Sequence, residues 1–178
     1  MAENVTQEIN IEDDSIEEDF SNAFNEDTKS EPVYEIDDKK EDLKTHGKIK
    51  TNLCGTIIKL DTGYSKTTLQ TTKDMVLDDL GLIHSGFIFG AADYAAAVAV
   101  NEANVVVIGS RSSFLAPAKL NDLIEFEAKT KFEDSRKREI KVTAYINEIK
   151  IYEGIFHAVV LEQHIFKTKI KNAGRSYS

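Results

Sequence analysis

The segment that most constrains the fold is an almost uncharged run from His84 to Val100, HSGFIFGAADYAAAVAV. Its small and apolar residues predict a helix about 25 Å long, at about 1.5 Å of rise per residue. A helix that is apolar nearly all round is enclosed by other elements of the fold. Asp93 is the one charged side chain in this run. Because an unpaired charge in an apolar interior is costly, Asp93 needs either a partner or a task.

Segments with strand character flank this helix on both sides. Residues 48–72 are typical of two strands around a turn at 61–63, and a loop follows at 78–81. About four segments rich in Val, Ile, Phe and Tyr, with partial alternation, come after the helix. Turns are expected at 133–139 and at Asn147–Glu148. This order predicts an α+β fold in which an antiparallel sheet wraps round one helix.

The charge of the chain is unevenly placed. The formal net charge is −9, but residues 1–42 hold 16 acidic residues against three lysines, and the remainder holds 15 acidic against 19 basic residues. A polar, acidic segment cannot offset the entropy of ordering it. We therefore expect a largely disordered acidic tail over 1–45, one domain over 46–168 and a basic C-terminal tail over 169–178.

One pattern within the acidic tail has two interpretations. Ile16, Phe20 and Phe24 recur at the spacing of one helix face. This stripe indicates either a short helix that docks on a protein partner or a solvated segment with no such role, and the second interpretation is the simpler one.

Composition also excludes several classes of protein. The single cysteine, Cys54, leaves no internal disulfide and fits a reducing compartment. The sequence contains neither a secretory signal nor an apolar run long enough to span a bilayer, so we expect a cytoplasmic protein. The acidic tail argues against binding to nucleic acid. His157, Glu162 and His164 lack the spacing of metal ligands, and we expect no metal.

Two motifs carry a resemblance to a known family. His84-Ser85-Gly86 followed by FIFGAADYAAA is similar to a His-Gly-Gly sequence, an apolar turn and a catalytic Asp in an Ala-rich helix. FLAPAKLNDLIEFEA, residues 114–128, is similar to the strand start of the same family. Over about residues 48–166 the chain therefore resembles the hotdog-fold acyl-CoA thioesterases, in particular the phenylacetyl-CoA-pathway branch. It is also similar to flagellum-coregulated hotdog virulence proteins, which add an N-terminal extension.

The resemblance implies an antiparallel sheet wrapped round one long central helix, and a homodimer or tetramer with acyl-CoA sites at the subunit interface. Asp93 matches the catalytic carboxylate, and Ser85 matches the residue whose backbone N–H polarises the thioester carbonyl. Eight residues of helix separate them by about 12 Å, so the working pair must come from different subunits. His84 stands beside them among the candidate catalytic residues, although capping the helix is the role that we favour for it.

Other residues complete the candidate substrate site. Gly86 follows the oxyanion donor, and Asp78 stands where some family members have an Asn that holds the thioester oxygen or the water. A carboxylate cannot donate that hydrogen bond unless it is protonated. Ser85 and Asn121 each replace a family Gly. The candidate contacts for the phosphates of coenzyme A are basic: Arg111, Lys119, Arg136, Lys137 and Arg138.

Two functions follow from these residues. The first is hydrolysis of an acyl-CoA thioester, with coenzyme A entering only as part of the substrate and Asp93 activating water or attacking directly. The second is a non-catalytic acyl-CoA sensor that signals through the acidic tail to a protein partner, with a link to motility or virulence. Asp93 in its expected position favours the enzyme, whereas Asp78 and the long tail favour the sensor.

Overall fold

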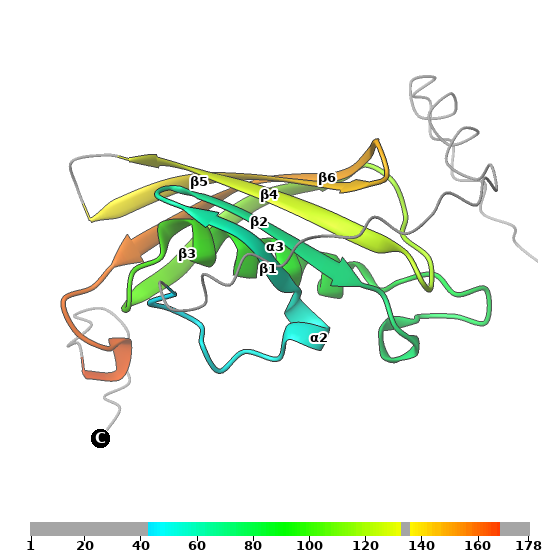
Figure 1. Cartoon of the computed structure of the whole chain (residues 1–178), viewed down its shortest axis with the longest axis horizontal. Coiled ribbons are helices and arrows are strands. Elements are labelled where there is room, and N and C mark those ends of the chain that lie inside the picture. The colour runs from blue at the N-terminus through cyan, green and yellow to red at the C-terminus, as the bar shows by residue number, and fades with distance from the viewer. Residues whose placement is uncertain (1–42, 133–135, 168–178) are drawn as a thin grey trace, which may run out of the picture. The chain divides into compact units, whose positions relative to one another are not determined.

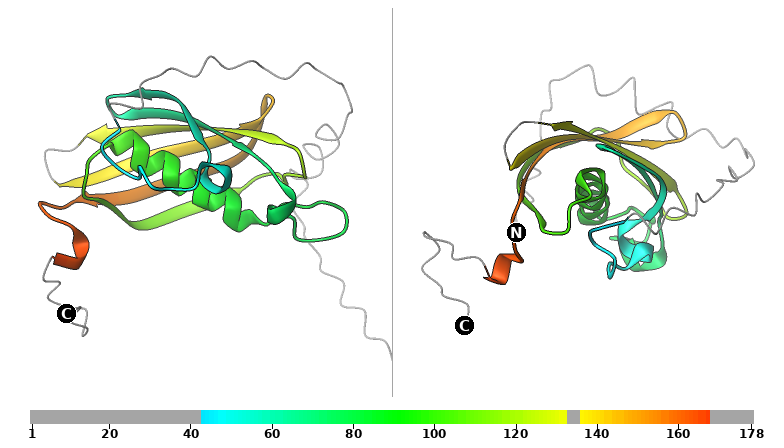
Figure 2. Two further views of the ribbon diagram at one scale, coloured as in Figure 1. Left: turned by 60° about the horizontal axis from the view of Figure 1, so that its bottom comes forward. Right: turned by 60° about the vertical axis from the view of Figure 1, so that its left-hand side comes forward.

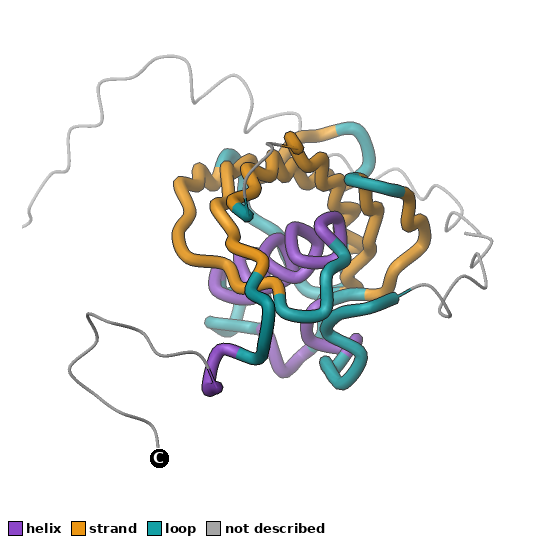
Figure 3. The backbone as a smooth tube through the Cα atoms, turned by 90° about the vertical axis from the view of Figure 1, so that its left-hand side faces the viewer, coloured by secondary structure: helices purple, strands orange, loops and turns teal. Residues whose placement is uncertain are grey.

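A single antiparallel sheet arches over α3 (Ser85–Val100) in the computed structural model, which describes residues 43–132 and 136–167. Within those ranges the sheet has six strands in the order β1-β2-β4-β5-β6-β3 (Figure 1). Viewed along the helix, the strands surround α3 on one side and leave the other side free of sheet (Figures 2 and 3). The bounds are β1 Thr56–Asp61, β2 Tyr64–Gln70, β3 Val105–Phe114, β4 Leu123–Phe132, β5 Lys137–Ile146 and β6 Ile149–Val160. The predicted α+β hotdog fold is confirmed.

The alanines of α3 let the sheet approach the helix closely. Ser65 on β2 is fully buried and donates a hydrogen bond of 2.8 Å to the carbonyl of Ala95. The helix ends at Asn101, whose φ of 49° is left-handed and whose N–H donates to the carbonyl of Ala97. The main core lies between helix and sheet, and its largest side chains come from the strands: Leu69, Ile124, Phe126, Ile140, Val142, Tyr152 and Phe156.

Turn residues lie where the sequence places them. Gly63 and Gly81 have φ values of 73° and 85°, and Asn147 has a φ of 54° between β5 and β6. Glycine adopts this left-handed region freely and Asn tolerates it better than most residues. Asn121, which replaces a family Gly, has a φ of 72° for the same reason. The turns at Gly63 and Asn147 join neighbouring antiparallel strands, and Gly81 ends the loop before α3. The predicted loop at 78–81 and the predicted turns at 61–63 and 147–148 are confirmed.

Two local predictions are wrong. Residues 48–54 do not begin a strand, because Thr51–Cys54 forms one helical turn, α2, and β1 starts only after Gly55. Gly55 has a φ of 100°, and a Cβ there would lie 2.8 Å from the carbonyl oxygen of Thr68, so the chain turns sharply at this glycine. Lys137, Arg138 and Glu139 do not lie in the turn predicted at 133–139. They begin β5, because the ladder with β4 continues as far as Phe132 and Arg138.

Residues 43–50, which we call the strap, lie on the side of α3 that the sheet leaves free (Figure 2). The backbone N–H of Lys44 donates to Oδ1 of Asn101 at 2.8 Å, and Thr45 is only 6% exposed. Leu43 and Ile49 pack against Leu60, Tyr94 and Val98. The folded structure thus includes Leu43 to Thr45, which sequence analysis assigned to the tail.

Several predictions concern residues outside the described ranges. They are the disorder expected for residues 1–42, the stripe of Ile16, Phe20 and Phe24, the turn residues 133–135 and the C-terminal tail at 169–178. Among the helices that the structure does describe, none has the length and hydropathy needed to cross a bilayer.

Candidate functional site

The His84 side chain shapes the first turn of α3. His84 is the N-cap residue, and its Nδ1 accepts a hydrogen bond of 2.9 Å from the N–H of Gly86. An accepting Nδ1 carries no hydrogen, so the cap requires a neutral ring with its hydrogen on Nε2. A Cβ at position 86 would lie 2.7 Å from His84 Nδ1, and the ring would have to leave its capping position. His84 therefore has the capping role favoured for it, and the Gly86 N–H is occupied by that cap.

Ser85 offers the free backbone N–H at this end of the helix. It is the first residue of α3 and is exposed. A helix leaves its first N–H groups without intrahelical partners, and in the described part of the chain no backbone carbonyl accepts from the Ser85 N–H. The helix dipole adds partial positive charge at this point. The Ser85 N–H can therefore stabilise an oxygen atom that becomes negatively charged.

The loop that leads into α3 brings Asp78 and Lys119 to the same end of the helix. Oδ1 of Asp78 accepts hydrogen bonds of 3.0 Å from the N–H groups of both Leu80 and Leu82. Leu82 in turn forms an isolated antiparallel bridge with Lys119. Asp78 is exposed, and its carboxylate holds its own loop in shape instead of donating a hydrogen bond outward. Asp78, His84, Ser85, Gly86 and Lys119 thus lie at one end of the molecule's central helix.

Asp93 is a half-buried carboxylate in the middle of α3. It lies about 200° round the helix from Ala95, whose carbonyl is bound to β2, so its side chain points away from β2. Within the described residues, no group donates a hydrogen bond to its carboxylate and no cation forms an ion pair with it. Burial raises the pKa of Asp93, and the nearby His46 partly opposes that rise. The structure therefore gives this carboxylate no structural partner inside the monomer.

One pair of hydroxyl groups, on Ser112 and Tyr152, was not predicted. Tyr152 on β6 is fully buried, and its hydroxyl lies 2.7 Å from Oγ of Ser112 on the neighbouring strand β3. Burial raises the pKa of Tyr152, the Ser112 hydrogen bond lowers it, and the charge of Asp93 raises it further. A Cβ at Gly154 would lie 2.8 Å from the Tyr152 hydroxyl, so this glycine makes room for the pair. Alternation along β6 indicates that Tyr152 faces inward, but no sequence signal links it to Ser112.

His46, on the strap, is the third residue that sequence analysis missed. Its ring centroid lies 6.1 Å from that of Tyr94, the residue that follows Asp93. Burial lowers the pKa of His46, and the charge of Asp93 opposes that change. His46 lies 47 positions before Asp93 in the sequence, in a segment that composition assigned to the boundary of the tail, and no motif marks it.

The five basic residues expected to bind the phosphates of coenzyme A do not gather in one place. Lys119 precedes β4, whereas Arg136, Lys137 and Arg138 lie beyond the other end of that ten-residue strand, about 30 Å away at about 3.3 Å per residue. Arg136 forms an ion pair with Glu162, and both side chains are largely exposed. A single protomer therefore does not bring all five to one ligand.

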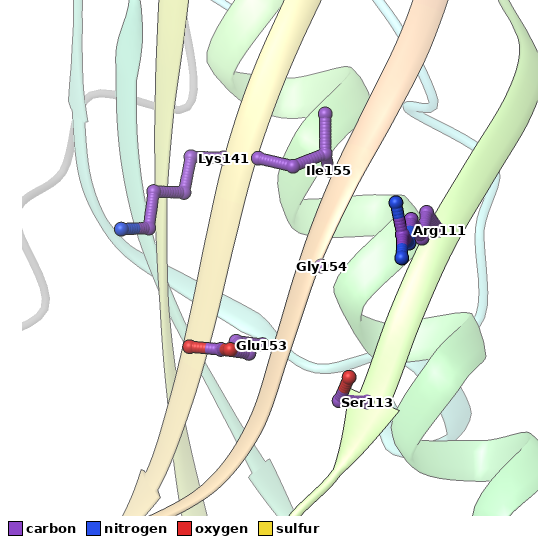
Figure 4. Close-up of a pocket in the computed structure, with 6 residues that line it drawn as sticks. All are labelled: Arg111, Ser113, Lys141, Glu153, Gly154 and Ile155. Carbon is purple, nitrogen blue, oxygen red and sulfur yellow. The ribbon is translucent and has the colours of Figure 1, made fainter.

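Arg111 occupies a third position, on the outer face of the sheet. It lines an open hollow together with Lys141 and Glu153, on the side of the sheet away from α3 (Figure 4). Arg111 and Lys141 are the two cross-strand neighbours of Ile155, one on each side. Because strand residues alternate between faces, this hollow is separated from Asp93 by the sheet itself.

Exposed apolar side chains surround the start of α3 and follow β3. Leu80, at the tip of the loop, is 93% exposed, and Leu77 and Leu82 on the same loop are also accessible. Ile108 in the middle of β3 is 58% exposed. Such surfaces on a monomer are typical of contacts with another protein or with an apolar ligand. Across the residues the structure describes, no group of His, Cys, Asp and Glu side chains gathers to hold a metal ion.

Comparison with solved structures gives close relatives. The sigma28-regulated virulence protein Cj0977 from Campylobacter jejuni is 45% identical, with a TM-score of 0.69 over 71% of this chain and 89% of that protein. The uncharacterised protein PH1136 from Pyrococcus horikoshii is 37% identical, with a TM-score of 0.68 over 69% of this chain and 95% of the relative. A Helicobacter felis homologue of HP0420 is 32% identical, with a TM-score of 0.65 over 69% and 89% of the two chains.

A curated sequence relative carries a different activity. The methylthioribose-1-phosphate isomerase of Aquifex aeolicus is 41% identical over 120 residues, which are 67% of this chain but only 26% of the isomerase. The chain thus spans about a quarter of the length of that relative, and the match assigns no isomerase activity to it.

More distant hotdog structures share the fold alone. They include the phenylacetic acid degradation protein PaaI of Escherichia coli, which is 21% identical with a TM-score of 0.58 over 63% of this chain and 83% of PaaI. No protein-family model matches the chain. The high identity to Cj0977 over most of its length, together with the shared hotdog fold, shows that the chain belongs to the family that contains this virulence protein.

Proposed function

We propose that the protein binds an acyl-CoA thioester between two protomers and hydrolyses it, with Asp93 as the general base. The observation that carries this proposal is the Asp93 carboxylate itself, which is half-buried in an apolar helix and has no partner among the described residues. Burying a charged carboxylate in an apolar environment costs free energy, and a carboxylate that is buried without a structural bond fits a chemical role.

The chemistry follows from the environment of Asp93. Burial raises the pKa of Asp93, which makes the ionised carboxylate a stronger base than an exposed one. Asp93 takes a proton from water, the water oxygen bonds to the thioester carbon, and the carbonyl oxygen becomes negatively charged. The Ser85 N–H at a helix N-terminus stabilises that oxygen. The C–S bond then breaks, and the thiolate of coenzyme A receives the proton from Asp93.

The two groups must come from different protomers. Ser85 and Asp93 lie about 12 Å apart along one helix, too far to serve one carbonyl. The edge strand β3 offers ten residues for pairing with a second copy, and its exposed Ile108 favours burial there. Joining two sheets at this edge would bring Asp93 of one subunit towards Ser85 of the other. A hypothetical thioesterase from Streptococcus pneumoniae, solved with coenzyme A, shares this fold, so coenzyme A thioesters are the first ligands to test.

A second candidate is a non-catalytic acyl-CoA sensor with a role in virulence. Two observations favour it. Asp78 stands in place of the family Asn, and its carboxylate accepts two backbone hydrogen bonds instead of offering a donor to the substrate. In addition, Cj0977, at 45% identity, is a virulence protein. In this case the site would bind the thioester and leave it intact.

The test is thiol release from a panel of acyl-CoA thioesters of increasing chain length, with binding of the same ligands measured by calorimetry. Asp93→Asn should lower kcat by about 100-fold or more and leave the dissociation constant nearly unchanged, because the amide keeps the shape but cannot accept the proton. Asp79→Asn, an exposed carboxylate beside Asp78, is the matched control and should behave like the wild type.

Binding without thiol release in the wild type would exclude the thioesterase and support the sensor. Neither binding nor release with any chain length would contradict both candidates. Equal kcat values for wild type and Asp93→Asn would remove Asp93 from the mechanism.

A further inference from the structure

The hydroxyl groups of Ser112 and Tyr152 meet on the inner face of the sheet, beside Gly154. The two oxygen atoms are 2.7 Å apart. Ser112 is the cross-strand neighbour of Gly154, and Tyr152 lies two residues before Gly154 on the same face of β6. A Cβ at Gly154 would lie 2.8 Å from the Tyr152 hydroxyl and 3.0 Å from Ser112 Oγ. The two side chains therefore meet in the space that this glycine leaves.

This hydroxyl pair has one hydrogen more than its own bond uses. Each hydroxyl carries one hydrogen, and the bond between the two oxygen atoms uses one of them. The phenol is the more acidic group, so Tyr152 donates to Ser112 and the hydrogen of Ser112 stays available. Tyr152 is fully buried whereas Ser112 is half-buried, so a ligand reaches the pair through the serine. In the described part of the chain neither hydroxyl has a further partner.

Aromatic rings surround the hydroxyl pair. The ring of Phe114 lies edge-on to that of Tyr152, with centroids 5.3 Å apart. A ring carbon of Phe156 would lie 3.2 Å from the same added Cβ at Gly154, so Phe156 borders the pair. The ring of Phe89 packs on Phe156, with 5.7 Å between centroids. Phe89 and Phe114 are 36% and 48% exposed, so these four rings form one aromatic surface that is accessible at both ends.

The aromatic surface begins on the side of α3 that carries the proposed catalytic groups. Phe89 lies four residues after Ser85 and four residues before Asp93. Residues four apart are neighbours on one side of a helix. Phe89 therefore lies beside whichever of the two groups its protomer contributes to a site, and the ring contacts lead from there to the hydroxyl pair.

We propose that Ser112 and Tyr152 determine the acyl specificity, because the Ser112 hydroxyl donates a hydrogen bond to an oxygen atom on the acyl chain. The aromatic surface binds the apolar part of the chain, and the donor meets a hydroxyl or keto oxygen on it. An acyl chain without such an oxygen would cover the donor and give it no partner, which weakens binding. The thioester carbonyl is bound elsewhere, by the Ser85 N–H. The specificity rests on the acyl-CoA ligand of the proposed function, but not on its hydrolysis.

The specificity is tested by calorimetry with acyl-CoA thioesters of four to eight carbons, each as the unsubstituted, 3-hydroxy, 3-oxo and ω-hydroxy chain. In the wild type, at least one oxygen-bearing chain should bind about 10-fold more tightly than the unsubstituted chain of equal length. Ser112→Ala should bring this ratio of affinities close to one. Ser113→Ala is the matched control and should keep the wild-type ratio, because Ser113 lies on the same strand but lines the outer hollow (Figure 4).

Tyr152→Phe is the second variant, since it keeps the ring against Phe114 and removes only the hydroxyl. It should give an intermediate ratio, because Ser112 keeps its hydrogen but loses the bond that orients it. A ratio near one for every chain in the wild type would overturn the proposed specificity. A lower Tm or weaker self-association of Ser112→Ala with an unchanged ratio would also overturn it, because the pair would then only fasten β3 or contact the second protomer.

The affinity ratios need no turnover, so a protein that binds acyl-CoA without releasing thiol still tests the specificity. Loss of hydrolysis and loss of specificity are therefore separate results. Binding of no acyl-CoA at all would contradict both the proposed function and the specificity.

Discussion

At the scale of single residues, the first turn of α3 depends on a contact between an imidazole and a backbone. The His84 ring caps the helix only because residue 86 has no Cβ. Ser85 lies between His84 and Gly86 in the sequence, so the cap that these two residues form also orients the free Ser85 N–H, the candidate oxyanion donor. The site thus combines two neighbouring amides with different roles, one bonded to the cap and one available to a substrate.

Gly86→Ala should displace the His84 ring and remove this cap. The loss of an N-cap hydrogen bond costs about 1 kcal/mol, which lowers the Tm by a few degrees for a domain of this size. Gly90→Ala, in the same helix with no atom within 4 Å of the added Cβ, is the control and should raise the Tm, because Ala is the better helix former. Equal thermal shifts for the two variants, measured by calorimetry, would mean that the cap contributes nothing.

At the scale of secondary-structure elements, the edge strand β3 is the most important for the association of two protomers that we propose. The sheet ends on one side at β1 and on the other at β3, and both edge strands contain a register shift. A ten-residue edge with an exposed isoleucine is a surface that another strand can extend. Because Asp93 and Ser85 cannot meet within one protomer, association of two protomers is a requirement of the proposed chemistry, and β3 is the edge that we propose for it.

Ile108→Lys should therefore weaken self-association and thiol release together, because it places a charge at the centre of the β3 edge. Ile58→Lys is the matched control, since Ile58 lies in the register shift of the opposite edge strand β1. Sedimentation at several protein concentrations measures the effect. Dissociation by the Ile58 change alone would place the interface at β1 and contradict the arrangement of the site.

The sequence predicts the elements well where a local pattern determines them. The apolar run from His84 to Val100 becomes α3 with its cap at His84, and Asn147 turns between β5 and β6 because an Asn tolerates a positive φ. The sequence-based prediction fails at 48–54, where partial alternation is typical of a strand but the chain turns sharply at Gly55, which lies close to the backbone of Thr68. Local patterns contain no signal for such a long-range approach.

The candidate site was predictable only in part, for the same reason. Ser85 and Asp93 belong to one motif on one helix, so the sequence predicts their spacing. His46 comes from the strap and contacts Tyr94 only after folding. Ser112 and Tyr152 come from two strands and meet each other only after folding. The five basic residues show the opposite error, because they were expected to lie together and do not. Their shared charge predicted one phosphate site, but the length of β4 keeps Lys119 and Arg136 far apart.

At the scale of the whole molecule, the folded domain begins a few residues earlier than the sequence predicts. The strap begins at Leu43, directly after the acidic segment, and packs on α3 through Leu43 and Ile49. The last residues before the predicted domain, Leu43 to Thr45, are thus part of its fold.

Two truncations separate these roles. Removal of residues 1–42 should change neither the Tm nor the affinity for acyl-CoA, because an acidic, polar segment adds little buried apolar area. Removal of residues 1–50 also exposes the apolar surfaces of Tyr94 and Val98, at a cost of about 2 kcal/mol, and should lower the Tm by about 5–10 °C. A comparable loss of stability on removal of 1–42 alone would mean that the stripe of Ile16, Phe20 and Phe24 docks on the domain.

The contact between His84 and residue 86 also has an evolutionary consequence. Any larger residue at 86 displaces the ring, and once the ring is lost, the reason to keep glycine there disappears. We therefore expect the two positions to vary as a pair: a relative that lacks His84 is free to vary residue 86, whereas a relative that keeps the capping histidine should keep the glycine. Ser85 between them would contribute only its backbone N–H to the proposed chemistry, so a serine at this position need not disturb the cap formed by its neighbours.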